Sequence, residues 1–170
     1  MVTVKLANAT TPFQYARFRA EQPLLQPASQ ELVPNFTHQE NDFNAFNVET
    51  LIPHALTNEG PPLAVADING DGLDDVFAGG ARGQAGQLFL QQPNGSWKSI
   101  ANSSLEADRE SEDVAATFTD VNNDGHPDLI VLSGGQESPD TPALLAPRLY
   151  LNVDGLELVR APNAFPKIYF

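Results

Sequence analysis

The sequence predicts an all-β protein built from four-stranded antiparallel meanders, the blades of a β-propeller. Three observations lead to this prediction. An acidic loop pattern occurs twice, each copy lies between two short apolar segments, and each copy is followed by two more strand-like segments that are separated by a turn. A unit of this kind that repeats along a chain is typical of propeller blades.

The acidic pattern, D-x-N-x-D-G-x-x-D, fits residues 67–75 and again residues 120–128. Oxygen-bearing side chains at alternate positions, followed by a glycine that allows a sharp turn, are what a loop needs to surround a hard cation. Calcium takes about six to eight oxygen ligands. We therefore expect two Ca²⁺ sites, with backbone carbonyl ligands from Leu73 and His126 and with these side-chain ligands: Asp67, Asn69, Asp71 and Asp75 in the first site, and Asp120, Asn122, Asp124 and Asp128 in the second.

Two other interpretations of these loops are weaker. An EF-hand loop ends in a glutamate at its twelfth position and is followed by a helix, but that position is Ala78 in the first copy and Val131 in the second. A pair of Asx-rich turns without metal is the other possibility. So many carboxylates at this spacing would repel one another without a cation, which favours calcium.

The strands follow in order around each loop. Apolar residues lead into and out of each acidic loop, and Gly-Gly pairs end the second strand, which is typical of buried strands. Third and fourth strands are predicted on either side of the turns at 93–95 and 153–155. The predicted strands are 63–67, 75–79, 87–90 and 96–100 in the first blade (62–101), and 115–120, 128–132, 148–151 and 156–159 in the second blade (113–160).

The remaining segments do not repeat this pattern. We expect an N-terminal strand and a Pro/Gln-rich linker over 1–35, a divergent lead-in over 36–61 that packs on the first blade, and the start of a truncated next blade over 161–170. A closed propeller needs about four to eight blades. Residues 1–61 could form a divergent third unit, but we favour an incomplete arc of a larger propeller. Its open edges and apolar faces would favour self-association or contact with further blades.

Composition limits the possible partners. The chain has 170 residues and a formal net charge of −13, which suits one domain with a sizeable core and argues against nucleic acid. It has no cysteine, and no stretch is long enough to span a membrane. Weak calcium sites fit compartments rich in Ca²⁺, so we expect an extracellular, cell-surface or periplasmic protein whose signal is not present in this chain.

We expect no catalytic residues and no further cofactor. The three histidines are scattered, whereas a zinc site needs them close together. The acidic segment 106–113 could supply paired carboxylates for glycoside chemistry, but such a run is more typical of a solvated link between blades. The glycine-rich segment 79–86 lacks the Lys and Ser/Thr of a phosphate-binding loop.

The repeated pattern resembles the FG-GAP or VCBS repeat, the calcium-loop blade of integrin α subunits, with Gly80-Ala81-Arg82 where that family often has Gly-Ala-Pro. The longer run 36–87 resembles bacterial surface proteins that combine such repeats with an ASPIC/UnbV domain and are relatives of the cartilage acidic proteins. These resemblances imply a calcium-stabilised extracytoplasmic propeller that acts in adhesion or in binding a protein or glycan ligand, whose identity stays unknown. The alternatives are a lyase or hydrolase acting on polysaccharides, or a lectin that binds sugar between neighbouring blades.

Overall fold

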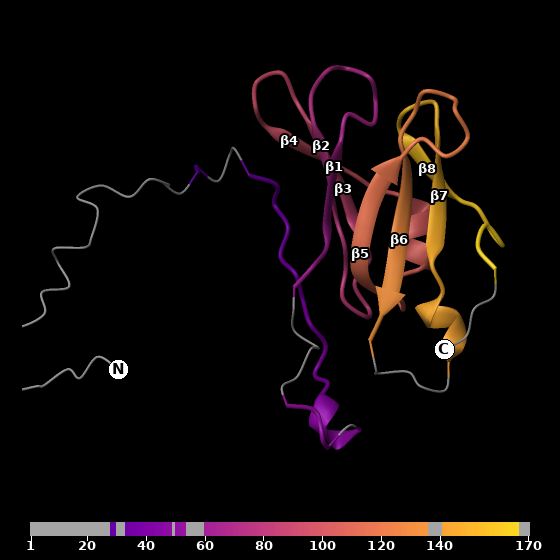
Figure 1. Ribbon diagram of the computed structural model, residues 1–170. Helices are drawn as coiled ribbons and strands as arrows, with labels where there is room; N and C mark the ends of the chain where they lie inside the picture. The colour runs from indigo at the N-terminus through magenta and orange to yellow at the C-terminus, as the bar shows by residue number, and fades with distance from the viewer. Residues whose placement is uncertain (1–27, 30–32, 49, 54–59, 136–140, 167–170) are drawn as a thin grey trace, which may run out of the picture.

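The computed structural model describes residues 28–29, 33–48, 50–53, 60–135 and 141–166, which form two four-stranded antiparallel sheets that lie side by side (Figure 1). The strands of the first sheet are β1 (Leu63–Ala66), β2 (Asp75–Ala78), β3 (Gln87–Gln91) and β4 (Trp97–Ile100), and those of the second are β5 (Glu112–Thr119), β6 (Asp128–Gly134), β7 (Arg148–Val153) and β8 (Glu157–Arg160). Each sheet pairs its strands in chain order. This meander confirms the predicted all-β fold and is consistent with two propeller blades.

Helices are few and short among the described residues. A helix of one turn, α1 (Ser103–Ala107), joins the two sheets, and two 3₁₀ helices, η4 (Ala45–Asn47) and η5 (Pro142–Leu145), lie outside them. Among the described residues, no helix combines the length and the apolar character that crossing a membrane requires.

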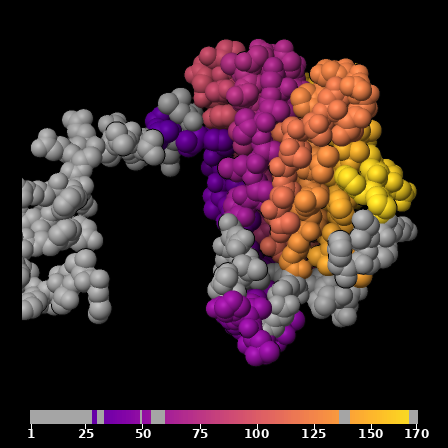
Figure 2. All heavy atoms as spheres, viewed as in Figure 1, coloured from indigo at the N-terminus to yellow at the C-terminus, as the bar shows by residue number. Residues whose placement is uncertain are grey.

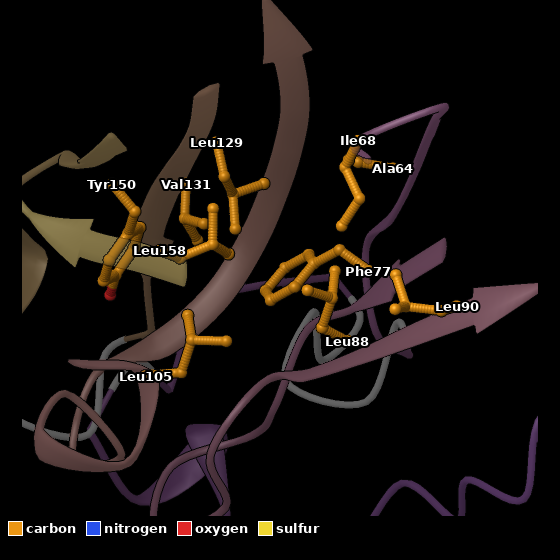
Figure 3. Close-up of a cluster of buried hydrophobic side chains, with 10 residues drawn as sticks. All are labelled: Ala64, Ile68, Phe77, Leu88, Leu90, Leu105, Leu129, Val131, Tyr150 and Leu158. Atoms are coloured by element: carbon orange, nitrogen blue, oxygen red, sulfur yellow. The ribbon is translucent and has the colours of Figure 1, made fainter. Parts of the chain in front are cut away.

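The core lies between the two sheets, as Figure 3 shows. Side chains alternate between the two faces of a strand, and the buried apolar side chains gather on the facing sides of the two sheets. Phe77 and Leu88 of the first sheet meet Leu129 and Tyr150 of the second, and all four side chains are fully buried. The apolar segments that predicted strands from the sequence therefore also supply the core.

The two blades stack in the same sense, so equivalent faces point in the same direction. Val76 pairs with Phe89 in the first sheet, and Leu129 pairs with Tyr150 at the equivalent position of the second. The second blade turns this face toward the first blade. The first blade turns it toward the segment 33–48, where the Phe36 ring lies edge-on against Phe89 with 6.2 Å between the ring centroids. Figure 2 shows this N-terminal segment beside the first blade.

Hydrogen bonds also hold the residues next to Phe36 against the first blade. The Gln84 side chain donates to the carbonyl of Thr37 at 2.8 Å and accepts from the amide of Gln39 at 2.9 Å. This part of the lead-in therefore packs on the first blade. The N-terminal strand expected within 1–35 and the start of a next blade expected over 161–170 lie largely outside the described residues, and the division of the chain into those segments stays a prediction.

The outer face of the second blade is apolar and partly open to solvent. Phe77, Leu88 and Leu90 of the first blade are covered by the second blade, but their equivalents Ile130, Leu149 and Leu151 are only half-buried. On the same face Leu132 is 44% exposed and Val159 is 40% exposed. An apolar sheet face of this kind is a surface for association.

We expect the protein to associate with itself through this open face of the second blade. Leu132→Lys combined with Val159→Lys should shift the population toward monomer, because a charged side chain is costly to bury at an interface. Leu51→Lys, at a side chain that is 96% exposed and lies outside the sheets, adds the same kind of charge elsewhere and serves as the control. Light scattering over a range of concentrations is the measurement, and a wild-type protein that stays monomeric throughout would contradict the prediction.

Candidate functional site

The two acidic loops lie at the same end of neighbouring blades (Figure 1). The first connects β1 to β2 and the second connects β5 to β6, so each is the link between the first two strands of its blade. This placement follows from the repeated order of the strands.

In the first loop, side-chain oxygens accept hydrogen bonds from the loop's own backbone. Asp67 accepts from the amides of Gly70, Asp71 and Gly72 at 2.8, 3.1 and 2.8 Å. The Asn69 side-chain oxygen accepts from the Asp71 amide at 2.9 Å. These bonds close the loop around its first carboxylate, as Asx turns do.

The second loop repeats these bonds with its own residues. Asp120 accepts from the amides of Asp124 and Gly125 at 3.2 and 2.9 Å. Asn122 accepts from the Asp124 amide at 3.0 Å, and Asp124 accepts from the His126 amide at 2.8 Å. The equivalent bond in the first loop runs from the Leu73 amide to Asp71, also at 2.8 Å. The two loops are therefore alike in structure as well as in sequence.

Two positions in each loop have left-handed backbone. The fourth position has a φ of 76° at Gly70 and 61° at Asn123, and the sixth has 82° at Gly72 and 89° at Gly125. Glycine adopts this conformation without strain, and asparagine tolerates it better than most residues. The loop geometry thus explains the glycine of the motif and the exchange of glycine for asparagine at the fourth position.

The last aspartate of each motif is fully buried. Asp75 and Asp128 begin the second strand of their blades, and neither has any exposed surface. Each accepts one amide from its own loop and one from the third strand, which joins the loop to the sheet. The donors are Ile68 at 3.2 Å and Gln91 at 2.9 Å for Asp75, and Val121 at 3.0 Å and Asn152 at 2.8 Å for Asp128.

Negative charge accumulates in these loops. Burial raises the pKa of Asp75, and the nearby charges of Asp71 and Asp67 raise it further, against hydrogen bonds from the Gln91 and Ile68 amides. In the part of the chain that the structure describes, no Lys or Arg forms an ion pair with a motif aspartate. The carboxylates therefore repel one another without a cationic side chain to offset the repulsion.

The donor set suits a hard cation by its chemistry. Carboxylate, amide and carbonyl oxygens are the ligands that calcium takes, and the hydrogen bonds leave free acceptor capacity on Asp67, Asn69, Asp71 and Asp75. Within the described ranges, however, no three carboxylate or imidazole groups gather closely enough to hold a metal ion by themselves. The loop side chains accept hydrogen bonds from backbone amides, and the assignment of ten residues as calcium ligands stays a prediction.

A comparison with known families agrees with this geometry. Residues 67–131 match the family model of the FG-GAP-like repeat. The match begins at the first aspartate of the first loop and contains the whole of the second loop. It supports the FG-GAP part of the resemblance found in the sequence. No curated protein matches the chain, and the finer resemblance to ASPIC/UnbV proteins stays a prediction.

A groove of about 890 Å³ is lined by residues of both blades, by the segment that joins them and by Phe36. Its lining includes Gln87 and Asn102, whose side-chain amides could in principle meet a ligand. Both are already engaged, because Gln87 donates to the Ser99 hydroxyl at 2.6 Å and Asn102 donates to the Leu158 carbonyl at 2.9 Å. The groove has the size of a ligand site, but these polar groups serve the fold.

The acidic segment 106–113, which we interpreted from the sequence as a solvated link, is partly buried, and that interpretation is wrong for Asp113. Asp113 lies on β5, accepts from the Gly80 amide at 2.8 Å and pairs with the buried Arg148. Burial raises the pKa of Asp113, and the charge of Arg148 opposes this effect. Arg148 also donates to the Tyr150 hydroxyl at 3.2 Å. The signal in the sequence was an arginine at an inward position of a strand otherwise rich in apolar residues.

A second aspartate of the segment belongs to the same network. The Tyr150 hydroxyl donates to Asp108 at 2.7 Å, and Arg160 also pairs with Asp108 at 2.7 Å. The guanidinium of Arg160 lies 5.5 Å from the centroid of the Tyr150 ring. These carboxylates therefore fasten the link between the blades to the second blade.

Removing the buried partner of Arg148 should destabilise the protein strongly. Asp113→Ala leaves a buried guanidinium without its carboxylate, and such losses typically cost about 3–5 kcal/mol. Urea unfolding measures this loss. The double variant Asp113→Ala/Arg148→Met removes both charges and should recover part of the stability. A single variant as stable as wild type would show that the pair does not hold the blades.

Proposed function

We propose that this chain is a calcium-stabilised part of a β-propeller in an extracytoplasmic protein, where it acts in adhesion or in binding a protein or glycan ligand. The observation that carries the proposal is the repetition of one loop at the same end of two neighbouring blades. Both copies share most of their hydrogen bonds, and both have a buried final aspartate and no Lys or Arg partner among the described residues. Carboxylates that repel one another occur in both loops, and a bound cation would offset that repulsion.

The calcium ions would have a structural role. Asp67, Asn69, Asp71, Asp75 and Leu73 would hold one ion, and Asp120, Asn122, Asp124, Asp128 and His126 the other. Because each loop connects the first two strands of a blade, an ion bound only by the folded loop stabilises the blade by mass action. Millimolar calcium outside the cytosol would keep such sites occupied even at modest affinity.

A lectin is the second candidate, and the groove between the blades is the observation that favours it. Its 890 Å³ is within the range of small-molecule sites, about 300–1,000 Å³. The engaged amides at Gln87 and Asn102 weaken this candidate. For a polysaccharide lyase or hydrolase the support is smaller still, since Asp108 and Asp113 are held by arginines.

Calcium should raise the melting temperature, and Asp71→Asn or Asp124→Asn should reduce that rise. The asparagine keeps a side-chain oxygen that can accept from the amide two residues on, but it removes the charge that attracts the ion. A ligand present at 100 times its dissociation constant stabilises by about 2.7 kcal/mol. Thermal unfolding in excess EDTA, in millimolar CaCl₂ and in MgCl₂ is the measurement. Magnesium should act more weakly, because it demands octahedral geometry.

Asp74→Asn is the matched control for these variants. Asp74 lies in the first loop and is exposed, but it is not one of the predicted ligands, so the variant removes the same charge and should keep the full response to calcium. A wild-type protein that melts at the same temperature in EDTA and in calcium would refute the structural calcium. Equal losses in Asp71→Asn and Asp74→Asn would mean that the response reflects overall charge and not a site.

A further inference from the structure

Asn152 of β7 connects the two acidic loops through one buried side chain. Its amide group donates to the Ile68 carbonyl at 2.9 Å and to the Pro127 carbonyl at 3.2 Å. Ile68 is the second residue of the first motif, and Pro127 is the eighth residue of the second. Asn152 is only 1% exposed, so these bonds form away from water, where a hydrogen bond is stronger.

The turn that follows Asn152 lies against the same two loops. A Cβ atom at Gly155 would lie 3.3 Å from the Asn69 Cα, 3.4 Å from the Ile68 carbonyl oxygen and 3.5 Å from the His126 Nδ1. The β7–β8 turn of the second blade is therefore in contact with the first loop and with its own loop. Two independent contacts, one polar and one steric, bridge the blades at this end.

The bridge is not a by-product of packing. The side-chain oxygen of Asn152 is buried without a hydrogen-bond partner in the structure, which is unfavourable. An apolar side chain would fill the space without that penalty. What the asparagine adds is its amide group, and both bonds of that group go to the acidic loops.

The first blade provides an internal comparison. Gln91 occupies the equivalent position, and its backbone amide donates to Asp75 just as that of Asn152 donates to Asp128. The Gln91 side chain is only half-buried, and it forms no hydrogen bond with the described residues. The backbone bond thus occurs in both blades, whereas the side-chain bridge belongs to the contact between the two loops.

We propose that Asn152 couples the two acidic loops, so that a calcium ion bound in one loop raises the affinity of the other. This rests on the calcium binding proposed above. An ion in the first loop would order the backbone around the Ile68 carbonyl. That carbonyl accepts a hydrogen bond from the Asn152 side-chain amide, and the same amide donates to the Pro127 carbonyl of the second loop. The second ion then meets a loop that is already ordered, and less conformational entropy is lost on binding. The effect must be reciprocal.

Calorimetric titration with CaCl₂ tests the coupling. Asp124→Asn reports the affinity of the first loop alone and Asp71→Asn that of the second. The coupling factor is the overall two-site constant of the wild type divided by the product of these two single-site constants. Coupling between sites is typically about 5–150-fold, so we expect at least about 5-fold. In the Asn152→Ala background the same factor should fall close to one, whereas in the Gln91→Ala background it should be unchanged.

Gly155→Ala keeps the test valid if Asn152→Ala does not fold. It leaves both side-chain bonds of Asn152 possible but presses a methyl group on the first loop. Gly95→Ala is its control, since Gly95 has a φ of 81° and Gly155 one of 80°, so the backbone strain is alike. Gly155→Ala should lower the coupling factor and Gly95→Ala should not. A wild-type factor of one, or a factor that Asn152→Ala and Gly155→Ala both leave intact, would overturn the proposal.

Amide hydrogen exchange in EDTA separates the bridge from calcium binding. Asn152→Ala, compared with Gln91→Ala, should accelerate exchange at the protected amides of both loops, including Gly72 and Gly125. Faster exchange in only one loop, or in neither, would show that Asn152 does not connect them. Calcium binding by none of the proteins would overturn the proposed function and the cooperativity together, and the exchange result would then decide on the bridge alone.

Discussion

The buried carboxylates of Asp75 and Asp128 are the constraint on which this end of the molecule depends. A carboxylate without contact to water needs hydrogen bonds in its place, and these come from backbone amides of the loop and of the third strand. Meeting that need fixes where each loop begins and how it lies on its sheet. The final aspartate therefore fixes the shape of the loop through the loop amide, and it also joins the second strand to the third through the strand amide.

Local patterns made the strands and the loops predictable from the sequence. Short apolar segments bounded by Gly-Gly pairs or turns identify the strands, and a left-handed position favours a glycine or asparagine such as Gly72 or Asn123. The pair of Asp113 and Arg148 was not predictable in this way. Its partners are 35 residues apart in the chain, and they come together because β6 pairs with β5 on one side and with β7 on the other. The bridge from Asn152 to Ile68 spans 84 residues and has no local pattern at all.

Repetition in sequence gives equivalent backbones but not equivalent surroundings. Val76 and Leu129 occupy the same position in their blades, yet Leu129 is fully buried against the first blade and Val76 is only half-buried. Phe36 takes part of the place that a preceding blade would have, as an aromatic contact on Phe89. The same reasoning separates Asn152 from Gln91. A residue acquires a role between blades only where a neighbouring blade offers it a partner.

The hydrogen bonds that close the acidic loops are compatible with the proposed binding of a cation. An ionised carboxylate has about four acceptor sites, and Asp71 uses only two of them, for the Leu73 amide and the Asn69 side chain. The amide bonds can thus persist while an ion takes the remaining sites. A loop already held in shape loses less entropy on binding, and the repulsion among Asp67, Asp71 and Asp75 is relieved at the same time. Both effects favour the bound state, and both arise from the spacing of the motif.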